Sequence, residues 1–241
     1  MEILYLLVAR GGSKGVPDKN LQRIEGLSLV GYKVRSALGS KSCDRVIVST
    51  DSKAILDEAV SHGAIGPFLR PSELATDDAS TSDVIAHALD WLRANEGKTY
   101  DAVMLLEPSS PFALPSDYDA AVQLMAEKEA SSVLGIGPVG VATVFTGPLE
   151  QNGRLSAIAA KVMELSKVDR QSIAQEYTMN GALYLFRRDM FENTHSIYGD
   201  PENTYGHVMD SYQSIEIDEP IQLEWARFLA ESGRINCSLW K

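Results

Sequence analysis

ILYLLVARGGSKGVPDKN, residues 3–20, joins an apolar run to a loop rich in glycine and basic side chains. The first six residues are continuously apolar, which is typical of a strand buried on both faces of a sheet. The loop contains three glycines, whose backbone N–H groups can approach an anion closely, and the cations Arg10, Lys14 and Lys19. This stretch therefore predicts a buried strand that ends in a phosphate-binding loop.

Short apolar runs bounded by turn residues recur along the chain: RVIVST (45–50), AVMLLE (102–107), SSVLGI (131–136), ALYLF (182–186) and SIEI (214–217). Apolar residues at helical spacing occupy three segments between them: 29–38, 51–63 and 82–95. Thr81 or Ser82 is the expected N-cap of the third helix. The alternation predicts an α/β fold, with one domain over residues 1–241 and a mostly parallel sheet covered by helices on both faces.

One segment, residues 138–179, departs from this alternation. Its periodicity is weaker, it holds three glycines, and its middle is charged. We expect an insertion that packs on a partner subunit. A long surface excursion on a monomer would have the same composition.

Composition limits the classes of partner. Asp and Glu total 33 against 22 Lys and Arg, and the net charge of −11 argues against a nucleic-acid partner. Cys43 and Cys237 have no metal-binding or redox spacing, and neither a signal peptide nor a long apolar span is recognisable. We therefore expect a cytoplasmic protein that does not associate with membranes.

Two familiar phosphate motifs are absent from the sequence of the first loop. It contains neither G-x-x-x-x-G-K-[ST] nor a G-x-G-x-x-G that leads from a strand into a helix. An ATPase or dinucleotide-binding function is therefore disfavoured. Ligands of parallel sheets bind beyond the carboxyl ends of the strands, so the loops at 9–20 and 107–115 and the stretch after Ile217 are the candidates.

Seven blocks, in this order, resemble the CMP-N-acylneuraminate (CMP-sialic acid) synthetase family of cytidylyltransferases: ARGGSKGVPDKNL, GLSLVGYKVRSAL, VIVSTDS, RPSELATDDASTSDVIAHAL, LLEPSSPF, NGALYLF and SIEIDEPIQLEWA. They extend over nearly the whole chain. The resemblance implies a three-layer, Rossmann-like nucleotidyltransferase fold with a small dimerisation insertion. It also implies transfer of CMP from CTP to the anomeric hydroxyl of a nonulosonic acid, with Mg²⁺ as cofactor and release of pyrophosphate.

The resemblance assigns the nucleotide site residue by residue. The triphosphate side comprises Arg10, Gly11, Gly12, Ser13, Lys14, Lys19 and Asn20, and the cytidine side comprises Arg70, Ser80 and Ser82. Because charge develops on the attacked α-phosphate, Arg10 and Lys14 are the expected catalytic cations. Read without the resemblance, Ser80 and Ser82 are ordinary helix caps.

The acidic pair Glu216 and Asp218 is the expected metal site, with Asp218 also catalytic. On an extended chain, residues two apart share one face, and their carboxylates can bind a hard cation. An edge strand with exposed acidic residues would show the same pattern.

The resemblance also assigns a sugar pocket to Glu107, Ser109, Ser110, Arg170, Asn180 and Gly181. In the family, the arginine at position 170 comes from the insertion and crosses to the partner of a homodimer. Residues 138–179 would then complete the neighbouring subunit's site.

Three positions depart from the family pattern. Glu107 replaces the usual glutamine of Q-P-[TS]-S-P, Thr178 replaces a second sugar-binding arginine, and Glu216 replaces the commoner aspartate. An anionic Glu107 repels a carboxylate or phosphate but accepts hydrogen bonds from hydroxyl or amide groups. We therefore expect a sugar other than N-acetylneuraminate, such as a legionaminic or pseudaminic acid.

Two alternatives remain. A CMP-Kdo synthetase shares the chemistry, although the NGALYLF and SIEID blocks favour the nonulosonate branch. A non-catalytic nucleotide-binding homologue would keep the fold without turnover.

Overall fold

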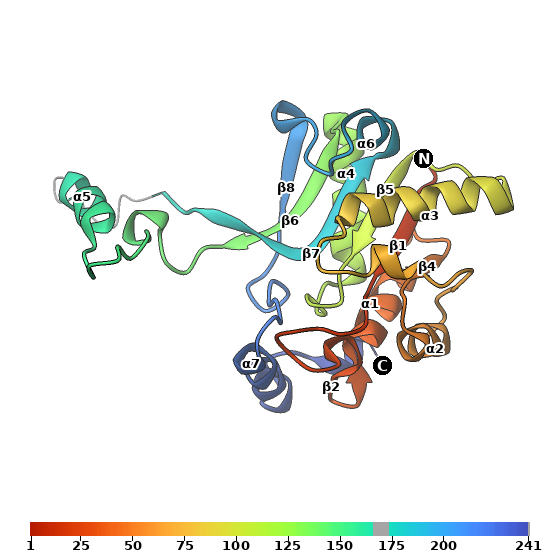
Figure 1. Cartoon of the computed structure of the whole chain (residues 1–241), viewed down its shortest axis with the longest axis horizontal. Coiled ribbons are helices and arrows are strands. Elements are labelled where there is room, and N and C mark those ends of the chain that lie inside the picture. The colour runs from red at the N-terminus through yellow and green to blue at the C-terminus, as the bar shows by residue number, and fades with distance from the viewer. Residues whose placement is uncertain (166–173, 241) are drawn as a thin grey trace.

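In the computed structural model, which describes residues 1–165 and 174–240, a six-stranded sheet forms the centre of the protein (Figure 1). Its strands are, in spatial order, β4 (Val46–Ser49), β1 (Ile3–Val8), β5 (Ala102–Leu106), β7 (Tyr177–Arg187), β6 (Ser132–Pro138) and β8 (Thr204–Val208). β7 runs antiparallel to its neighbours β5 and β6, and the other pairs are parallel. The expected mostly parallel α/β sheet is confirmed.

Helices cover both faces of the sheet, so the side chains of β1, which point alternately to one face and the other, are buried on both. Tyr5 and Leu7 pack with α1 (Leu29–Leu38), α2 (Lys53–Ser61) and α4 (Pro115–Lys128). On the opposite face, Leu4 and Leu6 pack with α3 (Thr81–Glu96) and α6 (Arg188–Thr194). A strand buried on both sides needs no polar face, which explains its continuous apolar sequence.

A third apolar cluster ties the first loop to the C-terminal part of the chain. Val16 of the loop packs with Ile217, with the two-stranded sheet of β2 (Arg23–Ile24) and β3 (Leu27–Ser28), and with α7 (Pro220–Glu231). Figure 1 shows α7 and β2 together below the sheet. This cluster brings the first loop and the C-terminal part of the chain to one side of the cleft described below.

Most expected elements are confirmed, with three differences. Residues 214–217 are not a strand. Both sides of β5 are already paired, with β1 and β7, and the segment makes one hydrogen bond beyond the end of β5, from Ile217 N–H to the Ser109 carbonyl (2.7 Å). Ser80, rather than Thr81 or Ser82, caps α3 and accepts from Asp83 N–H. Strand β8 was not expected from the sequence, because it is a partly exposed edge strand and TYGHV contains no apolar run.

Part of the 138–179 segment projects from the body as an arm (Figure 1). Its base is the paired region of β6 and β7, which reaches Pro138 opposite Tyr177. Its end carries α5 (Ser156–Leu165). No helix of the described residues is long and apolar enough to cross a membrane.

Candidate active site

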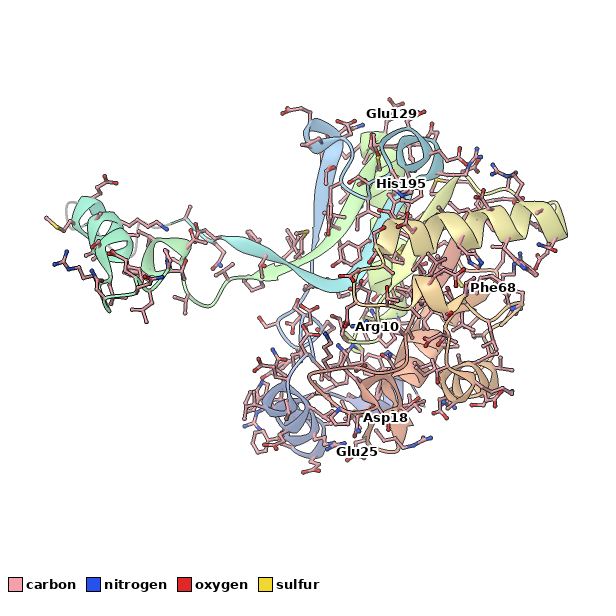
Figure 2. The ribbon with its side chains drawn as sticks, in the orientation of Figure 1. Arg10, Asp18, Glu25, Phe68, Glu129 and His195 are labelled. Atoms are coloured by element: carbon pink, nitrogen blue, oxygen red, sulfur yellow. The ribbon has the colours of Figure 1, made fainter. Side chains whose placement is uncertain are left out.

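A cleft of about 570 Å³ opens at the carboxyl ends of β1 and β5. Its lining includes these residues predicted from the sequence: Arg10, Ser13, Lys14, Lys19, Asn20, Arg70, Glu107, Ser109, Glu216 and Asp218. Figure 2 shows Arg10 between the sheet and the lower segment that carries Asp18 and Glu25. The tertiary structure thus brings together side chains that are separated by about 200 positions in the sequence.

The first loop is held by contacts at both ends. Asn20 is buried, and its amide Nδ2 donates to the Arg10 carbonyl at 2.9 Å. Gly12 has a φ of +66°, which favours glycine. A Cβ at Gly15 would lie 2.1 Å from the Asp218 carbonyl oxygen, so the absence of a side chain there lets the loop pack against the C-terminal segment.

Carboxylates of the protein occupy the donors of this loop. Arg10 Nη1 lies 2.7 Å from one oxygen of Asp77, and Lys14 Nζ lies 2.6 Å from the other. Lys19 Nζ lies 2.8 Å from Asp218 Oδ1. All three predicted cations of the loop are therefore paired with carboxylates of the protein itself.

The acidic pair lies at the same end of the cleft. Burial and the nearby Asp218 raise the pKa of Glu216, and Lys19 opposes the shift. Although residues 214–217 form no strand, both carboxylates line the cleft. Two close carboxylates beside a basic loop form an oxygen donor set that suits a hard divalent cation.

A half-buried carboxylate and a fully buried ammonium lie at the other side of the cleft. Burial, followed by the charge of Glu216, raises the pKa of Glu107 to about 7, while Lys33 opposes the shift. Lys33 is fully buried, its Nζ donates to the Ala182 carbonyl, and burial lowers its pKa to about 7. The charges of Glu107 and Lys33 act on each other, so the two groups are neighbours at the end of β5.

A family model described as Cytidylyltransferase matches residues 4–227 of the chain. The chain belongs to the cytidylyltransferase family. It is 34% identical over 232 residues to a CMP-N,N'-diacetyllegionaminic acid synthase of Legionella pneumophila, with 94% of each chain covered. It is 32% identical to an N-acylneuraminate cytidylyltransferase of Escherichia coli, covering 93% of this chain and 51% of that protein.

The same fold occurs in a solved CMP:2-keto-3-deoxy-manno-octonic acid synthetase complexed with CTP. The TM-score is 0.69 with 16% sequence identity, and the match covers 96% of this chain and 99% of that one. This likeness confirms the nucleotidyltransferase fold expected from the sequence.

On the predicted cytidine side of this cytidylyltransferase, Arg70 is a rigid part of the wall. Its guanidinium is buried and donates to the Ser49 hydroxyl at 3.1 Å and to the Ser49 carbonyl at 2.5 Å. Ser80 caps α3, and Ser82 lines a neighbouring cavity instead of the main cleft. Thr81, which the sequence singled out only as a possible helix cap, lines both.

Of the described residues that were predicted to bind the sugar, Glu107 and Ser109 line the cleft, and the others do not. Ser110 and Asn180 are buried beneath the cleft, where Ser110 Oγ donates to the Asn180 carbonyl at 2.7 Å. Gly181 has a φ of +66°, and a Cβ there would lie 2.9 Å from Glu216 Oε1. Ser110, Asn180 and Gly181 therefore pack behind the residues that line the cleft. Arg170 lies outside the described residues.

A smaller cavity of about 190 Å³ adjoins the cleft and shares Thr81 and Glu107 with it. Its other lining residues are Ser82, Tyr184, Ser196, Ile197 and Tyr198. Glu107 therefore faces both spaces. Thr178 is exposed in β7 and lines neither of them.

Sequence reasoning missed two charged residues of the site. Asp77 lies within the quoted block RPSELATDDAS, but no pattern distinguishes it from Asp78. Lys33 carries a usable signal, because a lysine interrupts the apolar face formed by Val30, Val34 and Ala37. A charge at a core position of a helix implies a buried partner.

Proposed function

We propose that this protein transfers CMP from CTP to the anomeric hydroxyl of a nonulosonic acid and releases pyrophosphate. The observation that carries the proposal is the cluster of Arg10, Lys14 and Lys19 at the mouth of the cleft, in a chain of the cytidylyltransferase family. The hydroxyl attacks the α-phosphorus directly, so no protein nucleophile is needed. The protein orients both substrates and neutralises the charge that develops on the phosphate.

Mg²⁺ fits this site as the cofactor. Magnesium is commonly bound through one or two carboxylates together with substrate phosphates. Glu216 and Asp218 are two carboxylates beside the phosphate loop, and residues 1–165 and 174–240 contain no group of three or more ligands that could hold a metal by itself. When bound, the cation would supply positive charge to the triphosphate, and Lys19 would then be free to contact a phosphate oxygen.

The acceptor sugar is proposed to be legionaminic acid or a close relative. Glu107, between the cleft and the smaller cavity, offers a carboxylate where the family usually has an amide. A carboxylate selects hydroxyl or amide N–H donors on the sugar. The Legionella relative, which is named for N,N'-diacetyllegionaminic acid, supports the same substrate class.

A substrate panel tests the proposed function. Pyrophosphate release from CTP should occur with N,N'-diacetyllegionaminic acid or pseudaminic acid, at a kcat/KM at least about tenfold above that for N-acetylneuraminate. Preferred turnover of N-acetylneuraminate would contradict the substrate assignment. Preferred turnover of Kdo would favour the CMP-Kdo alternative, and CTP binding without turnover of any sugar acid would favour a non-catalytic homologue.

The arm is proposed to form a homodimer and to complete the partner's site. Val141, Leu149, Leu155 and Met163 expose between 50% and 72% of their surface. Several exposed apolar side chains on one projecting segment are typical of an interface. Cytoplasmic localisation, proposed from the sequence, accords with the need for CTP.

Replacement of both Leu149 and Leu155 by aspartate is expected to convert a dimer into a monomer, measured by sedimentation velocity at micromolar concentration. Sugar turnover should fall with it, while CTP binding remains. Val60→Asp, on an exposed position of α2, is the matched control and should remain dimeric. A monomeric wild-type protein with full activity would refute the proposed arm function.

A further inference from the structure

One carboxylate, that of Asp77, bridges the two cations expected to bind the α-phosphate. Its two oxygens lie 2.7 Å from Arg10 Nη1 and 2.6 Å from Lys14 Nζ. A phosphate group would engage the same pair of cations through two of its oxygens. Asp77 therefore occupies the place, and makes the contacts, of the ligand for which this loop is built.

We propose that Asp77 is an internal competitor of the triphosphate, which holds Arg10 and Lys14 in the cleft and must release them when CTP binds. The inference rests on the proposed function, because it takes these cations to be the phosphate site. A triphosphate and Asp77 cannot both keep these contacts, since two anions on the same donors repel each other at close range.

The segment around Asp77 is built so that this side chain can leave. Arg70 fixes one end, because its guanidinium donates to the Leu74 carbonyl at 3.4 Å and to Ser49. Ser80 fixes the other end as the N-cap of α3. Between these anchors, the Asp77 side chain is 48% exposed, and its neighbours Thr76 and Asp78 are exposed as well. Its departure exposes no core.

The strength of the contact suits a competitor that is displaced in every cycle. Lys14 and Asp77 are exposed, at 75% and 48% of their side-chain surface. Exposed ion pairs are weak, so two of them reduce the affinity of a displacing anion by roughly three- to tenfold. The contact keeps the long basic side chains directed into the cleft without blocking a triphosphate.

The test compares Asp77→Asn with Asp78→Asn by isothermal titration calorimetry of CTP and of inorganic pyrophosphate in EDTA. Asp78 is the adjacent exposed carboxylate, for which the described residues provide no ion pair. Asp77→Asn should tighten the Kd of both ligands by about three- to tenfold, and Asp78→Asn by less than about twofold. Asp77→Ser replaces the carboxylate with a hydroxyl and leaves no amide that could still bind the two cations. It should behave like Asp77→Asn.

Steady-state kinetics provide an independent readout. Asp77→Asn should lower the KM for CTP while kcat stays within about twofold, whereas a merely structural role would lower kcat. Equal affinities for Asp77→Asn and Asp78→Asn, or weaker binding by Asp77→Asn, would overturn the proposal. If no sugar acid is turned over, the proposed function fails, but the pyrophosphate titration still decides whether Asp77 competes.

Discussion

Replacement of Asp218 by asparagine is expected to lower Mg²⁺-dependent turnover by about 10²- to 10³-fold. Asp218 contacts the phosphate loop, because its Oδ1 lies 2.8 Å from Lys19 Nζ, and it also lies beside Glu216. The asparagine amide keeps the size of the side chain but removes the charge that would hold a cation. The measurement is pyrophosphate release from CTP as a function of Mg²⁺ concentration.

CTP binding in EDTA separates metal binding from loop disruption. Asp218→Asn frees Lys19 from its ion pair, so metal-free CTP should bind as tightly as to the wild type, or more tightly. Asp210→Asn is the matched control, because Asp210 precedes the acidic pair and is not among the residues that line the cleft. Turnover close to normal with an unchanged Mg²⁺ dependence would exclude the proposed metal role.

Replacement of Glu107 by glutamine is expected to stabilise the protein at neutral and alkaline pH. The pKa of Glu107 is about 7 in the fold, against 4.5 ordinarily, so the folded protein binds more protons than the unfolded chain between these values. The contribution of Glu107 to the free energy of unfolding is therefore fully present below about pH 4.5 and is lost as the pH rises through about 7. Glu107→Gln should therefore be more stable by up to about 3 kcal/mol at pH 8, with the difference vanishing near pH 4.

Urea unfolding from pH 4 to 9, in buffer free of divalent cations and nucleotide, measures this difference. Glu224→Gln, an exposed position on α7, serves as control and should show no comparable pH-dependent gain. A constant offset across the pH range would show that packing, not ionisation, separates the variant from the wild type. Because Lys33 is present in both proteins, the difference reports mainly on Glu107 and its coupling to Lys33.

Such a cost at neutral pH is consistent with a functional role for Glu107. A half-buried carboxylate beside Glu216 weakens the fold unless a ligand or a cation satisfies it. Residues kept at the expense of stability are concentrated in functional sites. The substrate panel, repeated with Glu107→Gln, would show whether sugar preference moves toward N-acetylneuraminate.

The local sequence determined part of the strands and helices and the character of the first loop. Continuous apolar runs predicted β1 and β5, helical spacing predicted α1 to α3, and the basic glycine-rich loop predicted an anion site at the end of β1. These features depend on interactions between near neighbours in the chain, which periodicity records. The roles assigned to Arg10, Lys14 and Asp218 remain predictions that the experiments above would test.

The tertiary structure alone decided which charges meet. Residues 214–217 have the pattern of a strand, yet β5 is already paired on both sides, and the segment instead contributes Glu216 to the lining of the cleft. Likewise, only the fold brings Asp77 onto Arg10 and sets Lys33 behind Glu107. Such long-range contacts depend on chain topology and on burial, and one-dimensional spacing carries neither.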